Sequence, residues 1–418
     1  MAVFRPFRAI RPAPLYAAAV AALPYDTMSS AEARERVRGN PYSFLHVDKA
    51  EIDLPEGIDL YADAVYQTAA ANLSRMCADG IFVQDAENCF YIYQQTWRGR
   101  TQTGLVGCAS IDDYKNNIIK KHELTHPDKE TDRIRHVTAC NANTGPIFLM
   151  YRDSQGTADL LERWKSEHTS VCAFTDSAGV AQQIWVVDDA AYIDALKNRF
   201  AATDSLYIAD GHHRCASAYR VGMRKRGAAG EAYDPNAAYN YFLAVAFPEN
   251  QLQIMDYNRV VRDLNGLTTE SFLAKLQDLF AVEIVGKTGE PYHPENTHYF
   301  GMYLDGVWYR CRARRGLFDA DDPVARLDVE ILQKNVLAPL LGIQDPRRDK
   351  RIAFVGGIRG LEELERRCRT DMKIAFAMYA TTTRELMDIA DSGNIMPPKS
   401  TWFEPKLLSG LFVHDLEG

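Results

Sequence analysis

The sequence has no C-x-x-C pair, although eight cysteines are scattered through its 418 residues. Closely spaced cysteine pairs are the usual mark of a zinc knuckle or a thiol redox motif, so the sequence favours neither class. Scattered cysteines in a chain of this length are typical of buried free thiols in a reducing compartment. We therefore expect a cytoplasmic protein without a disulfide framework.

A long apolar run is lacking too, since no stretch approaches the roughly eighteen apolar residues of a transmembrane helix. The N-terminus imitates a signal peptide, because Arg5, Arg8 and Arg11 precede an Ala-rich stretch at 13–23. That stretch is only weakly apolar, contains Pro14 and runs directly into a helix-like start at 29–33. We interpret it as part of the mature chain and expect no membrane partner.

Basic residues are fewer than acidic ones, and the formal net charge is -8. Binding to duplex DNA normally needs a basic face that displaces counterions. The basic clusters at 224–226, 312–315 and 347–351 are short and interleaved with acidic residues, which is typical of solvated surfaces. No nucleic-acid partner is expected.

Internal repeats, low-complexity tracts and heptads are absent, and so is a complete glycine-rich phosphate loop. Gly356-Gly357 follows an apolar run and precedes a charged helical pattern. Without further glycines or a following Lys-Ser/Thr, this pair favours ordinary turn chemistry over a phosphate cradle.

Mixed helical and strand patterns fill the chain, of which 46% is hydrophobic, and predict an α+β fold. We divide it into an N-terminal α/β region at 1–105, a core at 106–265 with an insertion at 152–205, and a C-terminal α+β region at 266–418. The main predicted elements are strands at 41–47, 145–151, 206–210, 240–247 and 352–355, helices at 60–76, 159–167, 189–200, 270–279 and 327–341, and hairpins at 89–110, 171–187 and 298–312.

The stretch 206–219 carries the strongest functional signal. An apolar strand pattern stops at Asp210-Gly211, His212, His213 and Arg214 follow at once, and a helical spacing then begins. A helix start presents unpaired backbone N–H groups and partial positive charge, so it favours an anion such as phosphate. Asp-Gly is also a common turn, but two histidines and an arginine are unusual in a purely structural one.

Two other segments carry candidate site residues. His122-Glu123 lies four residues before His126, a spacing that suits metal ligation on one helix, but Pro127 argues against a continuous helix there. The run 395–406 is braced by prolines and contains Lys399, Ser400 and Lys406. It suits either a fixed loop beside an anion pocket or a rigid C-terminal wrapping segment.

These motifs resemble a known family. The run 207–214, together with Pro24-Tyr25-Asp26, the stretch 122–125 and the stretch 396–401, is similar to the bacterial family of domain of unknown function 1015. The resemblance spans essentially the whole chain, but the family name supplies no reaction.

A more distant resemblance, to free serine kinases of the ParB/sulfiredoxin superfamily, implies chemistry. Those proteins carry in order a His-Glu motif, an arginine-bearing helix, a Gly-x-Pro-Ile strand and Asp-Gly-His-His-Arg. This chain has the same order, ending in 145–147 and 210–214, and departs from it by the insertion at 152–205. The resemblance implies a ParB/sulfiredoxin-like core with α/β elaborations at both ends.

The same resemblance implies residue roles for phosphoryl transfer, which needs chiefly positioning and charge neutralisation. Glu123 would be the general base, with Asp210 and His212 also catalytic. Gly211, His212, His213 and Arg214 would hold nucleotide phosphates, and Asp210 would bind Mg²⁺. The predicted substrate-binding residues are His122, Lys399, Ser400 and Lys406.

We therefore predict a phosphotransferase that uses ATP or ADP with Mg²⁺ and acts on a small hydroxy amino acid, in the first place free L-serine or O-phosphoserine. The residues set no direction of transfer. Two alternatives remain open: a nucleotide-gated ParB-like binding protein, and a hydrolase of nucleotides or phosphoesters in which water replaces the serine hydroxyl.

Overall fold

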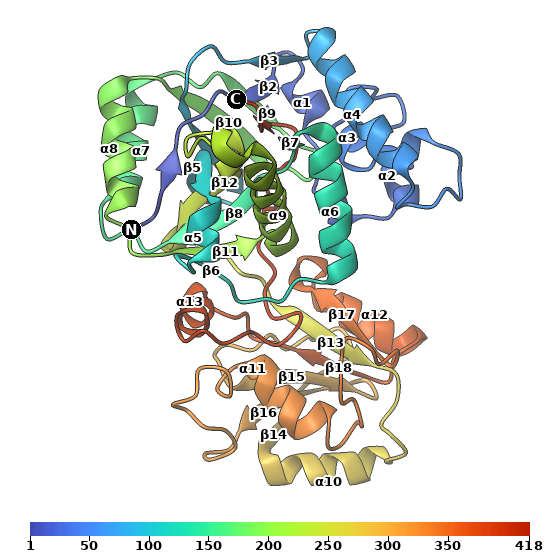
Figure 1. Cartoon of the computed structure of the whole chain (residues 1–418). Helices are drawn as coiled ribbons and strands as arrows, with labels where there is room; N and C mark the ends of the chain where they lie inside the picture. The colour runs from blue at the N-terminus through green and yellow to red at the C-terminus, as the bar shows by residue number, and fades with distance from the viewer. The chain divides into compact units, whose positions relative to one another are not determined.

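A computed structural model describes all 418 residues (Figure 1). The chain forms two compact units. The first comprises Met1–Leu252 and Pro405–Gly418, and the second comprises Gln253–Glu404. Both units combine helices with sheets, so the predicted α+β class is confirmed.

The first unit is built on a mixed nine-stranded sheet of order β6-β11-β8-β12-β5-β4-β10-β9, with β1 paired to β5. The pairs β6/β11 and β8/β12 are parallel and the others are antiparallel. The strands are β1 (Phe4–Arg5), β4 (Phe90–Trp97), β5 (Arg100–Ser110), β6 (Ile119–Lys120), β8 (Ile147–Tyr151), β9 (Cys172–Thr175), β10 (Ala181–Val187), β11 (Leu206–Asp210) and β12 (Tyr241–Pro248).

The central strands are buried on both faces because helices cover the sheet. All five residues of β8 are buried, in keeping with a continuous apolar run instead of alternation. Leu161 and Trp164 of α7 and Leu196 and Phe200 of α8 join the same hydrophobic core. The helices packed around this sheet are α5 (Ile111–Lys115), α6 (Pro127–Cys140), α7 (Thr157–Glu167), α8 (Ala190–Ala201) and α9 (His212–Ala229).

The N-terminal elements of this unit form a smaller core. They are β2 (Ile10–Pro12), α1 (Ala17–Val20), the 3₁₀ turn η1 (Tyr25–Thr27), α2 (Ser30–Arg36), α3 (Leu45–Asp48), the 3₁₀ turn η2 (Ala50–Asp53), α4 (Asp63–Ala78) and β3 (Phe82–Gln84). The C-terminal segment returns to this region, where Ser409 pairs with Ala22 and Val413 with Ile10. A further short ladder joins β7 (Ala142–Asn143) to β19 (His414–Asp415).

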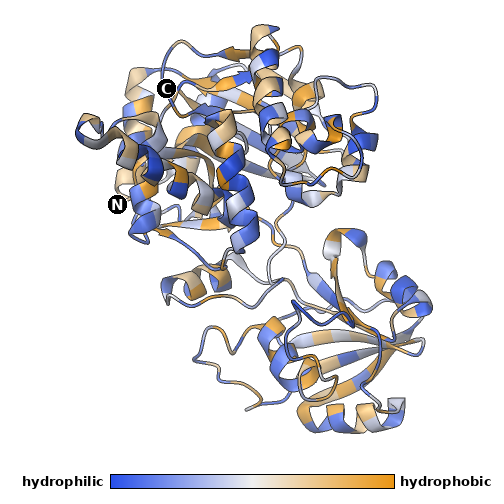
Figure 2. Cartoon of the chain, turned by 45° about the vertical axis from the view of Figure 1, so that its right-hand side comes forward, coloured by the Kyte–Doolittle hydropathy of each residue, from blue (hydrophilic) through white to orange (hydrophobic).

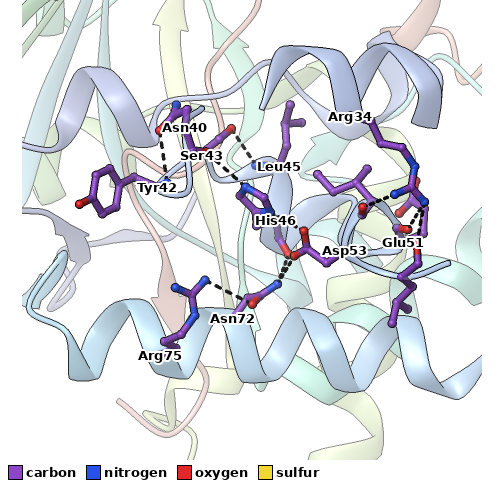
Figure 3. A network of polar contacts seen from close by, with 12 residues as sticks. Arg34, Asn40, Tyr42, Ser43, Leu45, His46, Glu51, Asp53, Asn72 and Arg75 are labelled. Atoms are coloured by element: carbon purple, nitrogen blue, oxygen red, sulfur yellow. Dashed lines mark hydrogen bonds and ion pairs between the residues drawn. The ribbon is translucent and has the colours of Figure 1, made fainter. Parts of the chain in front are cut away.

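The strand predicted at 41–47 is wrong, since this stretch is a turn followed by α3. Asn40 Oδ1 accepts a hydrogen bond from the Tyr42 N–H at 3.2 Å, which favours a turn over an extended chain. His46 Nδ1 then lies 2.7 Å from Asp53 Oδ1, and Asn72 of α4 donates to the other Asp53 oxygen at 2.8 Å (Figure 3). Side-chain bonds between neighbouring helices therefore decide the local structure.

The second unit contains a six-stranded antiparallel sheet of order β14-β16-β15-β18-β13-β17. Its strands are β13 (Tyr257–Val261), β14 (Phe280–Lys287), β15 (Tyr299–Leu304), β16 (Val307–Ala313), β17 (Ile352–Gly356) and β18 (Ile374–Ala377). Its helices are α10 (Thr269–Leu279), α11 (Asp328–Leu332), the π turn η6 (Gln333–Leu337), α12 (Glu362–Thr370) and α13 (Thr383–Asp391). Figure 2 shows hydrophobic and hydrophilic residues alternating along the helices, as expected where one face packs on a core.

The predicted regional boundaries at 105 and 265 do not coincide with these units. Strand β5 runs through residue 105 and pairs with both β4 and β12, so residues on either side share one sheet. The single helix predicted at 327–341 is also divided, because the i→i+4 pattern of α11 widens into the π turn at Gln333. None of the helices combines the length and apolar character that crossing a bilayer would require.

Candidate functional site

The site begins where β11 ends and α9 starts, as the sequence predicted. Gly211 has a φ of +96°, a left-handed conformation that suits glycine, and its N–H donates to Asp210 Oδ1 at 2.8 Å. A Cβ at this position would lie 3.1 Å from Arg214 Nε. No side chain caps α9, so its first N–H groups remain available to an anion at the positive end of an 18-residue helix.

Arg214 lies between two glycines. Its Nη1 donates to the Pro146 carbonyl oxygen at 2.6 Å, and a Cβ on Gly145 would lie 3.4 Å from the same nitrogen. Glycine at both 145 and 211 therefore lets this guanidinium lie close to the backbone at the start of the helix.

Asp210 faces Lys406, which the C-terminal segment brings back to this unit. Lys406 Nζ lies 3.1 Å from Asp210 Oδ2. Burial would raise the pKa of Asp210, but the nearby charges of Lys406 and Arg214 outweigh it and hold the pKa well below its usual range. Asp210 is therefore ionised at neutral pH, and Lys406 joins the predicted loop from almost two hundred residues away.

The segment between β6 and α6 crosses the start of α9 and brings Glu123 to the loop. Glu123 Oε2 lies 3.7 Å from His212 Nδ1. The His126 N–H donates to His213 Nε2 at 2.9 Å, and the His122 N–H approaches His212 Nε2 at 3.5 Å. These contacts hold the two sequence-predicted segments, His122-Glu123 and Asp210–Arg214, side by side.

These contacts also fix the protonation of the two histidines on α9. Burial lowers the pKa of His212 to about 4, although Asp210 opposes it, and burial also lowers the pKa of His213. Both rings are therefore neutral at pH 7. Because the Nε2 atom of each ring accepts a backbone N–H, its proton is assigned to Nδ1, and in His212 that atom faces Glu123.

His122 is buried beneath this arrangement, with 1% of its surface exposed. Its ring meets that of His212 edge-on, with 4.5 Å between the centroids, and neither ring nitrogen has a hydrogen-bond partner of normal geometry. Burial, reinforced by His212, lowers the pKa of His122 to about 3. Unpaired buried polar atoms are costly and suit a bound group or water. The Glu123 side chain, in contrast, is 40% exposed and accessible to a reactant.

A small polar cavity of about 20 Å³ adjoins the loop, and Arg214 forms part of its wall. Arg133 lies on the same cavity, with its guanidinium 3.9 Å above the Tyr25 ring and its Nε 2.8 Å from Asp132 Oδ2. Asp48 completes the charged lining. Two guanidinium groups and one carboxylate therefore surround a space that fits only a few atoms.

Sequence reasoning missed Asp48 and Arg133 and gave Tyr25 no role. The available signal was on α6, where Arg133 and His136 share the buried helix face with Ile134 and Val137. A charged residue within an apolar stripe is unusual unless it is paired or functional. Asp48 gave no such signal, because it directly follows the segment that was predicted to be a strand.

Lys399 and Ser400 belong to the second unit and make their contacts there. Ser400 is buried and its Oγ donates to the Pro397 carbonyl oxygen at 2.6 Å. The Lys399 ammonium lies 5.7 Å from the centre of the Tyr257 ring.

No three His, Cys, Asp or Glu side chains are grouped to hold a metal ion. His126 is the N-cap of α6 and His122 precedes it, so the two do not share a helix face. Both Asp210 oxygens already accept hydrogen bonds, from Gly211 and Lys406. These residues fit Mg²⁺ only as an ion that arrives with substrate phosphates, for which one protein carboxylate is a common ligand.

Comparison with known proteins identifies the family. A model of the family described as "Protein of unknown function (DUF1015)" matches residues 4–330. The chain belongs to the DUF1015 family. The resemblance drawn from the sequence motifs is thereby confirmed, and the match includes every element of the cluster except the segment that carries Lys406.

Several solved structures resemble this DUF1015 chain. SbnI with a C-terminal truncation, from Staphylococcus aureus, matches with a TM-score of 0.39 at 12% identity over 73% of this chain and 85% of that one. A mutant free serine kinase in complex with AMP matches with a TM-score of 0.34 at 13% identity, over 70% of this chain and 85% of that one. A conserved hypothetical protein from Pyrococcus furiosus matches with a TM-score of 0.33 at 15% identity, over 71% of this chain and 90% of that one.

A search of curated protein sequences gives no match. At TM-scores this low the structural likeness says nothing of substrate or reaction. The chemistry of the site therefore has to carry any functional proposal.

Proposed function

We propose that this protein is a phosphotransferase that moves a phosphoryl group between a nucleotide, ATP or ADP, and a small hydroxy amino acid, with free L-serine and O-phosphoserine as the pair that fits best. One observation carries the proposal: the Glu123 carboxylate, accessible and facing the Nδ1–H of a neutral His212, lies beside an uncapped helix start that bears Arg214. A base and a phosphate site are thus adjacent.

The phosphate side of the proposal rests on the first turn of α9. Backbone N–H groups there have no side-chain acceptor, and Arg214 adds a guanidinium. Anionic phosphates are stabilised at such a helix start by its N–H groups and its dipole. Mg²⁺ bound with the nucleotide would neutralise further phosphate charge, and Asp210 is its proposed ligand.

The acceptor side rests on Glu123. In the forward direction its carboxylate takes the proton from the serine hydroxyl, and the hydroxyl oxygen forms a bond to the terminal phosphorus while the bond from phosphorus to the nucleotide oxygen breaks. The Nδ1–H of His212 would hold the Glu123 carboxylate in place. The reverse reaction uses the same groups, and the residues set no direction.

The charged groups around the adjoining cavity favour a small zwitterion as the acceptor. Arg133 and Arg214 suit a carboxylate, and Asp48 suits an ammonium group. A space of about 20 Å³ is too small for a nucleobase or for a whole amino acid, so it would receive only one end of the acceptor. His122 and Lys406 stay proposed substrate contacts, and so do Lys399 and Ser400 in the second unit.

The decisive experiment incubates the full chain with Mg²⁺, ATP or ADP, and L-serine, and in parallel O-phosphoserine with AMP or ADP, under ³¹P NMR. We expect phosphoserine to appear or to be consumed in a nucleotide-dependent way. Glu123→Gln should lower turnover by about 10²–10⁴-fold because the base is lost, while nucleotide affinity stays within about threefold.

Two results would contradict this proposal. The absence of exchange in both directions from a folded sample would exclude the serine reaction. Equal loss of turnover and nucleotide binding in Glu123→Gln would make Glu123 a structural residue. Phosphate release without any acceptor would favour a hydrolase, an alternative that the exposure of Glu123 to solvent also permits.

We also propose that the strands and helices around β11 and α9 form a ParB/sulfiredoxin-like core. Proteins with such a core include nucleotide-gated DNA clamps, but a net charge of -8 disfavours that use here. A salt-dependent DNA shift assay with and without nucleotide distinguishes the two functions.

A further inference from the structure

The second unit contains a cleft of about 410 Å³, and its lining includes none of the residues proposed for phosphoryl transfer. Much of its wall is apolar and is supplied by segments far apart in sequence, including Leu337, Phe354 and Met396. The polar residues of the wall are Arg259, Glu330, Gln333, Gln344, Asp345 and Arg347. A cleft of this volume, lined by both apolar and polar groups, is in the range of small-molecule sites.

Arg259, on β13, is the unusual member of this lining. It is 3% exposed, and its guanidinium donates only to the carbonyl oxygens of Tyr257 and Lys399. No carboxylate forms an ion pair with it, and the centre of the Phe354 ring lies 5.5 Å from its Cζ. Burial lowers the pKa of Arg259 to about 10, and only Tyr257 opposes that effect. A buried cation without a counter-charge is strongly disfavoured.

The carboxylates in the same wall are already neutralised by other cations. Asp345 Oδ1 lies 3.0 Å from Arg347 Nε, and Glu330 Oε1 lies 3.1 Å from Lys334 Nζ. Arg259 is therefore the one charged group of the cleft wall without an opposite charge, and it is buried.

Residues 395–398 of the wall are held in a fixed shape by bonds to and from the adjoining Lys399 and Ser400. The Ser400 hydroxyl donates to the Pro397 carbonyl oxygen at 2.6 Å, and the Ser400 carbonyl oxygen accepts from Thr381 Oγ1 at 3.0 Å. The Lys399 carbonyl oxygen accepts from Arg259 Nη2 at 3.0 Å. Because this wall is braced before any ligand arrives, binding loses less conformational freedom than it would at a mobile loop.

We propose that this cleft binds a small organic acid with an apolar body, whose single carboxylate pairs with Arg259 while its hydrocarbon part lies against Leu337, Phe354 and Met396. One buried positive charge matches one negative charge. A nucleotide polyphosphate is a poor fit, because the apolar wall would desolvate its further charges without compensating them.

Isothermal titration calorimetry on the full chain tests the site, with 3-phenylpropionate and decanoate as probes and 3-phenylpropionamide and decanamide as their uncharged counterparts. We expect each acid to bind at least about tenfold more tightly than its amide, because only the acid compensates Arg259. Arg259→Met should abolish this preference.

A second pair of variants keeps the test decisive if Arg259→Met fails to fold. Ile395 is 38% exposed and lines the cleft, so Ile395→Glu places a negative charge there without disturbing the core. It should weaken the acids at least about fivefold, and the matched control Ile395→Gln should not.

Equal binding of acid and amide, or no binding of either acid below about 5 mM, would overturn the proposal. So would tighter binding of phenyl phosphate than of 3-phenylpropionate. None of these results depends on Glu123, so they leave the phosphotransferase reaction to its own test.

Discussion

Single residues carry much of the site, and Gly211 shows how tightly they are placed. Its left-handed φ turns the chain from β11 into α9, and Arg214 occupies the space that a side chain at 211 would need. Glycine at 211 therefore both permits the left-handed backbone and leaves room for the Arg214 guanidinium. A glycine elsewhere with a left-handed backbone but no such contact allows backbone strain to be measured separately from displacement of Arg214.

Gly211→Ala should lower the free energy of unfolding by about 1 kcal/mol, because alanine is strained at a positive φ. The added Cβ should also displace Arg214, so nucleotide affinity should fall by about tenfold or more. Gly179→Ala is the matched control, since Gly179 has a φ of +78° and no atom within 4 Å of the added Cβ. Urea denaturation and nucleotide titration measure the two effects. Similar affinity losses in both variants would contradict a specific role for the Arg214 contact.

Among the helices and strands, the elements defined by local patterns were predictable. The hairpin of β4 and β5 and the passage from β11 into α9 follow from alternation, turn residues and helical spacing within a few neighbouring residues. The α3 turn was missed because Asp53 and Asn72, which stabilise it, lie further along the chain. The cavity was not predicted for the same reason, because Asp48 and Arg133, which both line it, are 85 residues apart in the sequence.

The contacts that join α3, η2 and α4 predict a dependence of stability on pH (Figure 3). The hydrogen bond with Asp53 raises the pKa of His46, although burial opposes it. Burial would raise the pKa of Asp53, but His46 outweighs it and the pKa falls. The raised His46 pKa gives stability that is lost as pH rises through it, and the lowered Asp53 pKa gives stability that is lost as pH falls through it.

His46→Gln should therefore lower the free energy of unfolding most between about pH 4.5 and 6 and progressively less toward pH 8.5, by no more than about 1 kcal/mol because solvent screens the partly exposed Asp53 carboxylate. Urea denaturation across this range measures the difference from the native chain. Asn72→Ala is the control, since it removes three hydrogen bonds and no titrating histidine, and its cost in the free energy of unfolding should be the same at pH 6 and 8.5. A cost of His46→Gln that does not change with pH would contradict the ionic pairing.

At the scale of the whole molecule, the second unit is an insertion between two parts of the first. The chain leaves the first unit after Leu252 and re-enters it at Pro405. The two ends of the inserted unit lie together, since the Met255 N–H donates to the Trp402 carbonyl oxygen at 2.8 Å and Ile254 pairs with Phe403. Adjacent ends of this kind are typical of inserted domains that fold on their own.

Replacing 253–404 by a short Gly-Ser linker should thus leave the first unit folded, with Lys406 still paired to Asp210. Near-UV circular dichroism and a cooperative urea transition check the fold, and nucleotide titration checks the loop. Lys406→Met in the shortened chain is the control, and it should reduce nucleotide affinity by leaving Asp210 without its partner. An expanded, non-cooperative chain would show instead that the first unit needs the inserted one.

Re-entry of the chain at Pro405 also sets an order of assembly during translation. The ribosome completes the strand, turn and helix around Asp210 long before it reaches Lys406, and it makes the whole inserted unit in between. The nascent chain therefore carries the Asp210 carboxylate without its ammonium partner until Lys406 emerges. The loop at 210–214 gains its final electrostatic balance only after the inserted unit has been made, so a ribosome that stalls within that unit holds a chain whose loop is complete in sequence but not in charge.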